Sequence, residues 1–345
     1  MTLKSATKPD TPPFALLRAG YPFLTTLGMR RVTTYCMDIV IGDKDELYVL
    51  CRADSPGLGG SNIRRTNWND DDLDTIAGGK LLWPVQMISD SEGTLYISDE
   101  GRHSIIKIKQ DGTFVDEWGE EGSDAGQLNR PSGIAFDADE NLWVVDTLNH
   151  RVQKFNKDGR LISGFGSKGP GPGEFDMPWG VTVTGEGDLL VVDWHNDRVQ
   201  RFTADGEFIM EFGSSGSGDG EFNRPAGVEV DHHGDIYVAD RGNNRIQLFN
   251  PAGKYIDKFI GDATLSKSGE TYVRANPSVL RNREMANTEQ QKRMRGVAQV
   301  RFDNEGRMYV PDFGSHRIQV YNKLAYELTP DDLPPVPNHP TLYTV

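Results

Sequence analysis

The chain has 345 residues, of which 37 are Lys or Arg and 51 are Asp or Glu, so its formal net charge at pH 7 is −14. This acidic balance disfavours non-specific binding to nucleic acids and to anionic membranes, and no stretch approaches the ~18 consecutive apolar residues of a membrane-spanning helix. The first residues, MTLKSATKPDTPP, lack the apolar core of a secretory signal, and we therefore expect a cytoplasmic protein.

The N-terminal part of the chain is predicted to combine an arm with the first strands of a folded domain. Residues 1–20 are the expected arm, and residues 23–28, FLTTLG, have the form of a short strand that ends in glycine. The next apolar runs, CMDIVI from residue 36 and ELYVLC up to residue 51, predict two adjacent strands. Cys36 and Cys51 are expected to lie near each other there, as reduced structural thiols or, alternatively, as a disulfide.

From residue 84 onward the chain repeats with a period of 47 residues. Each copy closes an apolar run with an aspartate: Asp99, Asp146, Asp193 and Asp240. The strand that begins each copy starts fifteen positions earlier: Pro84, Pro131, Pro178 and Pro225. Each copy contains four short apolar runs separated by Asp, Asn and Gly turns, which is typical of a four-stranded antiparallel meander. One meander cannot bury both of its faces, so the copies are expected to stack around an axis as propeller blades.

The number of blades follows from the same register. A further copy is predicted from Val297 to Asp312, and a weaker first copy from Cys36 to Cys51, which makes six. The last copy has three clear strands, so one terminus must supply its fourth. We expect residues 23–28 to do so, with residues 324–329 as the alternative. The propeller is thus predicted over residues 21–329, followed by an extended, Pro-rich tail at 330–345.

The repeat sequences, with LWVVD or IYVAD runs, RVQ or RIQ after the turn, and strand starts such as RPSG, resemble the NHL-repeat family. The resemblance is to its bacterial single-domain members, covers residues 35–321, and implies an all-β fold, a six-bladed β-propeller. It implies function less directly, because the family includes both peptidyl-hydroxyglycine amidating lyase and domains that only bind RNA or protein. RNA binding requires a basic face, which the charge of this chain disfavours.

One long insertion interrupts the repeat between blades five and six. The spacing from Asp240 to Asp312 is 72 residues instead of 47. Within residues 261–295, Asn276 as N-cap and Pro277 at the first helical position predict a basic helix over 277–295. The loop at residues 53–61 is lengthened on the same face. We expect the helix to form a lid over the channel mouth or, alternatively, to be a solvated helix that packs on the rim by one edge.

The residues that line the channel in the related fold suggest what can be bound there. None of the six positions that correspond to the zinc ligands of the lyase is His, so its catalytic zinc is not expected. Asp38, Gln86 and Gln299 replace the glycine of the repeat, and Asp38 is predicted to hold Ca²⁺ or, alternatively, only water. Sequence motifs for an organic cofactor are absent.

The residues just after the closing aspartates are expected at the same channel mouth. His195 departs from the repeat and is predicted to act as a general acid or base. Arg52 and Arg241 are predicted to bind the charge of an anionic or amide-like substrate, and the resemblance implies this role for Arg241, which matches a catalytic arginine of the lyase. The predicted substrate-binding residues are Trp83, Gln86, Trp179, Trp194 and Gln299.

Aromatic walls with a few convergent polar groups are typical of a small-molecule pocket. The sequence therefore predicts a small-molecule-binding propeller that acts as a lyase or hydrolase at the channel mouth. The alternative is a non-catalytic platform for a protein or peptide, with residues 277–295 as the docking element.

Overall fold

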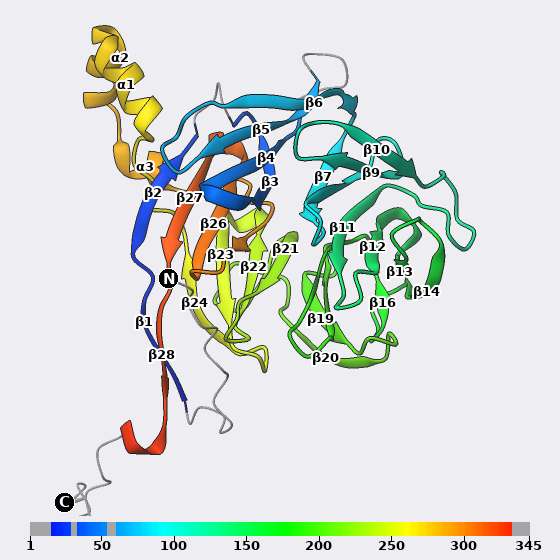
Figure 1. The fold of residues 1–345 in the computed structure, drawn as a ribbon. Helices are drawn as coiled ribbons and strands as arrows, with labels where there is room; N and C mark the ends of the chain where they lie inside the picture. The colour runs from blue at the N-terminus through cyan, green and yellow to red at the C-terminus, as the bar shows by residue number, and fades with distance from the viewer. Residues whose placement is uncertain (1–14, 29–32, 54–59, 333–345) are drawn as a thin grey trace, which may run out of the picture.

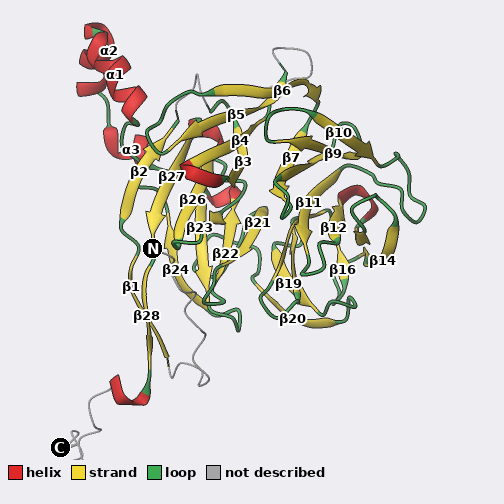
Figure 2. Cartoon of the chain, viewed as in Figure 1, coloured by secondary structure: helices red, strands yellow, loops and turns green. Residues whose placement is uncertain are grey.

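The structure is a computed structural model that describes residues 15–28, 33–53 and 60–332. In this part of the chain, six four-stranded antiparallel sheets surround a central axis as the blades of a propeller (Figure 1). Strands and turns make up nearly all of it; the three α-helices lie near one another at one side, and short 3₁₀ turns occur elsewhere in the chain (Figure 2). No helix in the described ranges is both long and apolar enough to cross a membrane.

The first three blades follow the chain from residue 36 to residue 165. Blade one consists of β3 (Cys36–Ile41), β4 (Glu46–Cys51), β5 (Ser61–Asn67) and β6 (Asp74–Leu81). Blade two consists of β7 (Pro84–Ser89), β8 (Thr94–Asp99), β9 (Ser104–Lys109) and β10 (Phe114–Trp118). Blade three consists of β11 (Pro131–Phe136), β12 (Leu142–Asp146), β13 (Arg151–Phe155) and β14 (Leu161–Phe165).

The last three blades complete the ring. Blade four consists of β17 (Pro178–Val183), β18 (Leu189–Asp193), β19 (Arg198–Phe202) and β20 (Phe208–Phe212), preceded by the short parallel pair β15 (Ser167–Lys168) and β16 (Glu174–Phe175). Blade five consists of β21 (Pro225–Val230), β22 (Ile236–Asp240), β23 (Arg245–Phe249) and β24 (Tyr255–Phe259). Blade six consists of β25 (Arg301–Phe302), β26 (Arg307–Asp312), β27 (Arg317–Asn322) and β2 (Phe23–Leu27).

The register of each blade confirms the predicted repeat. In blades two to five, the proline that starts the inner strand pairs with the closing aspartate, as Pro131 pairs with Asp146. The sixth copy differs, because its inner strand is regular only over β25, although Val297 and Val300 are buried.

The closing aspartates hold the blades together through their side chains. Asp146 accepts hydrogen bonds from the backbone N–H of Asn129 (2.6 Å) and from Arg151 Nε (2.7 Å). Asp193, Asp240 and Asp312 make the equivalent pair of contacts. These contacts give the aspartates a structural role, because each one joins its own turn to the loop that precedes its blade.

Glycine in the inner strands of blades three to five allows the blades to approach each other closely at the axis. A Cβ atom on Gly133 would lie 2.5 Å from the carbonyl oxygen of Trp179, and one on Gly180 would lie 2.3 Å from that of Ala226. No side chain fits such a gap, which explains why the repeat has glycine here.

The ring is closed by the N-terminal strand, as predicted. β2 pairs antiparallel with β27 and supplies the outer strand of blade six. The alternative segment instead forms β28 (Leu324–Leu328), which pairs with β1 (Ala15–Gly20) in a two-stranded ribbon. The expected arm at 1–20 therefore contains a strand at its end. Of the expected tail, Pro330–Asp332 forms a 3₁₀ turn, and residues 333–345 lie outside the described residues.

The insertion between blades five and six corrects the prediction of one lid helix at 277–295. It forms three short helices, α1 (Lys267–Ala275), α2 (Pro277–Glu284) and α3 (Thr288–Lys292), and α1 and α2 project from the body (Figure 1). The predicted N-terminus at Pro277 is correct, but the helix stops at Glu284, and the Asn287 side chain caps α3 by accepting from Glu289 N–H. α2 buries no residue, so tertiary packing does not stabilise a single long helix over residues 277–295.

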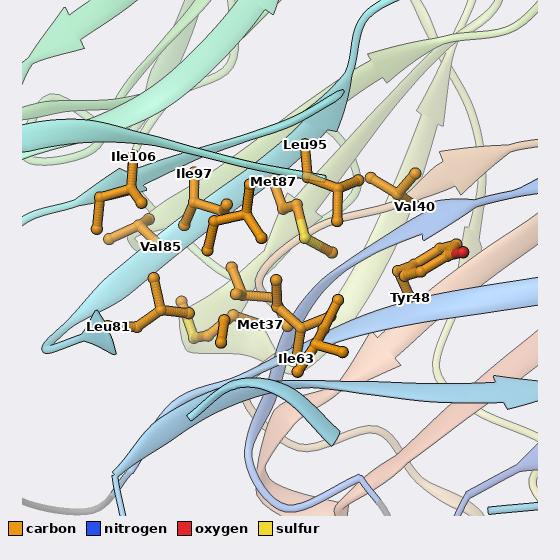
Figure 3. Packing of buried hydrophobic residues seen from close by; sticks show 14 of the residues in the cluster. Met37, Val40, Tyr48, Ile63, Leu81, Val85, Met87, Leu95, Ile97 and Ile106 are labelled. Atoms are coloured by element: carbon orange, nitrogen blue, oxygen red, sulfur yellow. The ribbon is translucent and has the colours of Figure 1, made fainter. Parts of the chain in front are cut away.

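Apolar side chains between neighbouring blades form the core. Figure 3 shows one such cluster, in which Met37 and Ile63 of blade one face Val85, Met87 and Ile97 of blade two. Cys36 and Cys51 lie in another cluster, directly opposite each other on β3 and β4. They are buried free thiols, as the prediction of two reduced structural cysteines requires.

Candidate functional site

A cavity of about 470 Å³ opens at one end of the central channel. Each blade contributes to it the residue that follows the end of its second strand: Arg52, Glu100, Thr147, Trp194, Arg241 and Phe313. The residue before the inner strand adds a second layer on blades two to four: Trp83, Arg130 and Met177. The predicted pocket residues Arg52, Arg241, Trp83, Trp179 and Trp194 all line this cavity.

The backbone of the second layer is fixed by the repeat itself. Arg130 and Met177 have positive φ angles of 55° and 52°. Their N–H groups donate to Nδ1 of His103 (3.2 Å) and of His150 (3.0 Å), respectively. These contacts give His103 and His150 a structural role, because they hold the backbone from which the cavity wall begins.

Glu100 forms a charged cluster on one side of the cavity. Its side chain is 2% exposed, and its Oε1 accepts from Arg52 Nη2 (2.5 Å) and Arg130 Nη2 (2.7 Å). Both guanidinium groups also lie over the ring of Trp83, at 4.8 and 5.7 Å from its centroid. These contacts fix the side chains of Arg52, Glu100 and Arg130, which come from different blades. Arg52 is therefore already paired with Glu100 before a ligand binds.

Arg241 lies in the same cavity with a different set of contacts. Its guanidinium stacks on Phe313, 5.0 Å from the ring centroid. Among the described residues it has no carboxylate within ion-pair distance and donates no side-chain hydrogen bond. Burial lowers the pKa of Arg241, and the charge of Arg52 lowers it further, while Glu100 acts in the opposite direction. The positive charge of Arg241 is thus held in a site where no paired anion among the described residues offsets the cost of its burial.

Trp179 and Trp194 form the aromatic wall. Their ring centroids are 5.3 Å apart, and the guanidinium of Arg224 lies 4.9 Å from the centroid of Trp194. The structure corrects the position expected for His195. This residue does not line the cavity: its ring packs against Trp194, with centroids 4.6 Å apart, and its Nδ1 is 3.5 Å from Asp176 Oδ2. Trp194 lines the mouth of the cavity, and the side chain of His195 lies outside it.

Gln86 and Gln299 lie deeper than the predicted ligand pocket. They line a small space of about 10 Å³ in the channel, below the cavity, which leaves room for about one water molecule. Gln86 Oε1 accepts from the N–H of Ile134 (2.9 Å), and its Nε2 is buried without a partner. Gln299 Oε1 accepts from the N–H of Val300 (3.0 Å). Both side chains therefore fill the channel, which corrects their expected role as walls of the ligand pocket.

Asp38 is fully buried and faces Arg301. Its two oxygens accept from Arg301 Nε (2.9 Å) and Nη2 (2.6 Å), and also from the N–H groups of Ile39 and Met87. The guanidinium of Arg301 therefore lies at the carboxylate that the sequence predicted to hold Ca²⁺. Arg301 also pairs with Glu229 (2.7 Å). The described residues contain no group of three or more His, Cys, Asp or Glu side chains placed to hold a metal. Calcium at Asp38 stays a prediction that these contacts disfavour.

The insertion does not cover the cavity. None of the residues that line the cavity belongs to α1, α2 or α3. The insertion instead attaches to the outer edge of blades six and one, where Asp70 accepts from Ser268 N–H (2.8 Å) and Thr26 Oγ1 accepts from Thr264 N–H (3.2 Å). The expected lid is therefore wrong in position as well as in length.

Comparison with known proteins supports the repeat and the fold. The family model described as the NHL repeat matches residues 128–155, 175–202 and 222–249, which lie in blades three to five. Among curated proteins, none has significant sequence similarity to the chain.

Several solved structures share the architecture. Virginiamycin B lyase from Staphylococcus aureus, solved as a catalytically inactive variant with quinupristin, is 14% identical with a TM-score of 0.55, over 90% of this chain and 89% of that one. A putative gluconolactonase is 16% identical with a TM-score of 0.56, over 92% and 96%. A protein of unknown function from Bacteroides thetaiotaomicron is 17% identical with a TM-score of 0.62, over 88% and 76%. At these identities the likeness establishes the fold alone. The chain therefore carries NHL repeats and is a six-bladed β-propeller.

Proposed function

We propose that the chain is a small-molecule-binding propeller, and that the cavity at the channel mouth takes an organic anion with an aromatic group. The observation that carries this proposal is Arg241, a half-buried guanidinium that lines the cavity and has no anionic partner among the described residues. The other two arginines of the cavity already share Glu100.

The electrostatics of the site favour a negative ligand. Three guanidinium groups and one carboxylate line the cavity, so the charges of the protein do not balance there. The lowered pKa of Arg241 reflects the cost of holding its charge against burial and against Arg52. A bound carboxylate would offset this cost, because charge-assisted hydrogen bonds to a guanidinium are strong in a site shielded from water.

The walls favour an aromatic group on the same ligand. Trp83, Trp179, Trp194 and Phe313 line the cavity together with Met37, Met177 and Leu148. Flat apolar rings pack well against indole rings that are themselves held in place, since little side-chain freedom is lost on binding.

Binding is better supported than the predicted lyase or hydrolase activity. The cavity is lined by no His, Cys, Lys or Tyr among the described residues, and its one carboxyl group, Glu100, accepts from two arginines. General acid–base catalysis needs a group within hydrogen-bond reach of the reacting atoms, and His195 lies behind Trp194. The enzyme names of the two solved propellers agree with either role, so they do not decide between them.

Calorimetric titration with 3-phenylpropionate tests the proposal. Arg241→Gln should weaken binding about tenfold or more, as expected for the loss of a charge-assisted hydrogen bond. Arg281→Gln, on the exposed face of α2, removes an equal charge far from the cavity and should leave the affinity unchanged. His195→Ala should also have little effect. Equal binding by the wild type and Arg241→Gln would contradict the proposal.

A further inference from the structure

Glu100 offers a second polar contact inside the cavity. Only its Oε1 accepts from Arg52 and Arg130, and Oε2 has no hydrogen-bond partner among the described residues. In a side chain that is 2% exposed, a carboxylate oxygen without a donor leaves a hydrogen-bond acceptor unused. Because Glu100 lines the cavity, a ligand can supply that donor.

The position of Glu100 in the ring sets the length of the ligand. Glu100 follows β8 of blade two, and Arg241 follows β22 of blade five. In a ring of six blades, blades two and five are opposite each other, so these residues meet the cavity from opposite sides of the channel axis. Trp179 and Trp194 belong to blade four and form a wall between them. One molecule that contacts both Glu100 and Arg241 must span the mouth along this aromatic wall.

The charges beside each contact define the two ends of such a molecule. The end at Arg241 is anionic. The end at Glu100 must donate a hydrogen bond without carrying positive charge, because Arg52 and Arg130 lie beside that carboxylate and repel a cation. The middle must be flat enough to lie along Trp179 and Trp194.

We propose that the ligand class is that of phenolic acids, in which a ring carries a carboxylate arm at one end and a hydroxyl at the other. This inference rests on the proposed function and adds to it a second specificity-determining residue, Glu100. A phenol is neutral and protonated at pH 7, since its pKa is near 10, so it donates to Glu100 while the carboxylate binds Arg241.

Four probes with the same ring separate these contributions in one titration series on the wild-type protein. They are 3-(4-hydroxyphenyl)propionate, 3-phenylpropionate without the hydroxyl, 4-ethylphenol without the carboxylate, and tyramine with an ammonium group in its place. The hydroxy acid should bind at least about tenfold tighter than 3-phenylpropionate, because sites built to hydrogen-bond a hydroxyl discriminate against analogues that lack it. Tyramine should bind weakest.

Glu100→Gln gives an independent check, with its folding confirmed by thermal melting. It should remove most of the preference for the hydroxyl and keep the binding of 3-phenylpropionate that depends on Arg241. If the variant fails to fold, the series on the wild type still decides the matter.

The outcomes distinguish this inference from the proposed function. If 3-phenylpropionate binds through Arg241 and the hydroxyl adds no affinity, the inference is overturned and the proposed function stands. If tyramine binds as well as the acids, the cavity does not select an anion, and both the inference and the proposed function fail. If neither acid binds, or if both bind equally well to Arg241→Gln, the proposed function fails as well.

Discussion

At the scale of single residues, the two cysteines show how burial controls chemistry. Burial raises the pKa of Cys51 to about 12 and that of Cys36 well above its usual value. Because the thiolate is the reactive form, both groups should be inert in the folded protein. We expect a thiol-specific chromogenic reagent at pH 8 to titrate neither cysteine until denaturant is added, and then to titrate both. Rapid labelling of the folded protein would contradict this burial.

Residues that repeat were the ones best predicted from the sequence. The closing aspartates bind the backbone of the loop before their own blade, the turn histidines bind the backbone before the next blade, and these contacts recur around the ring. The positions of Arg241 and Trp194 at the mouth followed from the same register.

Glu100 and Arg130 were missed because their roles come from contacts between blades that no local pattern encodes. Glu100 did stand at the same repeat position as Arg241, and this position was the available signal. His195 was misread for a related reason: a departure from the repeat marks a residue as unusual but does not say where its side chain points.

At the scale of elements, the insertion is attached to the propeller without contributing to the cavity. Its ends run together, as Met294 N–H donates to the carbonyl of Ile260 (3.0 Å). Replacing residues 264–291 by a short Gly-Ser linker should therefore leave the affinity for 3-phenylpropionate unchanged. It should lower the melting temperature by a few degrees, since Asp70 loses its contact with Ser268. A large loss of affinity would show that the insertion covers the mouth after all.

The basic helix was predicted in part. The sequence specified its N-terminus well, because Pro277 at the first position is a strong local signal. Its length and position were wrong, because these depend on packing, and α2 buries nothing. Binding of a protein partner by residues 277–295 stays a prediction.

The ribbon of β1 and β28 is anchored to blade five by a buried ion cluster. Asp235 accepts from Arg18 Nε (2.8 Å) and Lys323 Nζ (2.7 Å). Burial by itself raises the pKa of Asp235, but the hydrogen bonds from Arg18 and Lys323 outweigh it, so the pKa is lowered. A carboxyl group of this kind adds stability above its unfolded pKa of about 3.9 and loses it as the pH falls through the folded value.

Asp235→Asn should therefore destabilise the protein at pH 7 by about 3 kcal/mol, because Arg18 loses its carboxylate partner and Lys323 keeps only Asp231. The difference from the wild type should shrink as the pH falls below about 4. Asp205→Asn, at an exposed turn, is the matched control and should have no effect at either pH. Thermal melts of the wild type and the two variants at pH 7 and pH 3 measure these differences. A difference between Asp235→Asn and the wild type that stays constant with pH would contradict the ionised state assigned to Asp235.

At the scale of the whole molecule, the propeller depends on the N-terminal strand that closes its ring. Leu27 on β2 is 1% exposed, whereas Leu24 on the same strand is 44% exposed. Leu27→Ala should lower the free energy of unfolding by about 2–4 kcal/mol, and Leu24→Ala by less than about 1 kcal/mol. Urea titration compares the two. Equal effects would mean that β2 is not packed as the closing strand.

The architecture was predictable because a propeller is the sum of similar units. The period of 47 residues gave the blade boundaries, and the count of closing residues gave six blades. What the repeat left open was the content of the channel. Asp38 meets Arg301 over a separation of 263 residues, and such a pair forms only when the ring closes.

The most direct test of the account is a crystal structure of the protein with 3-phenylpropionate. We expect the carboxylate within about 3 Å of the Arg241 guanidinium, with the ring against Trp179 or Trp194. A ligand bound elsewhere while the mouth stays empty, or one in the mouth with its carboxylate turned away from Arg241, would contradict the central claim.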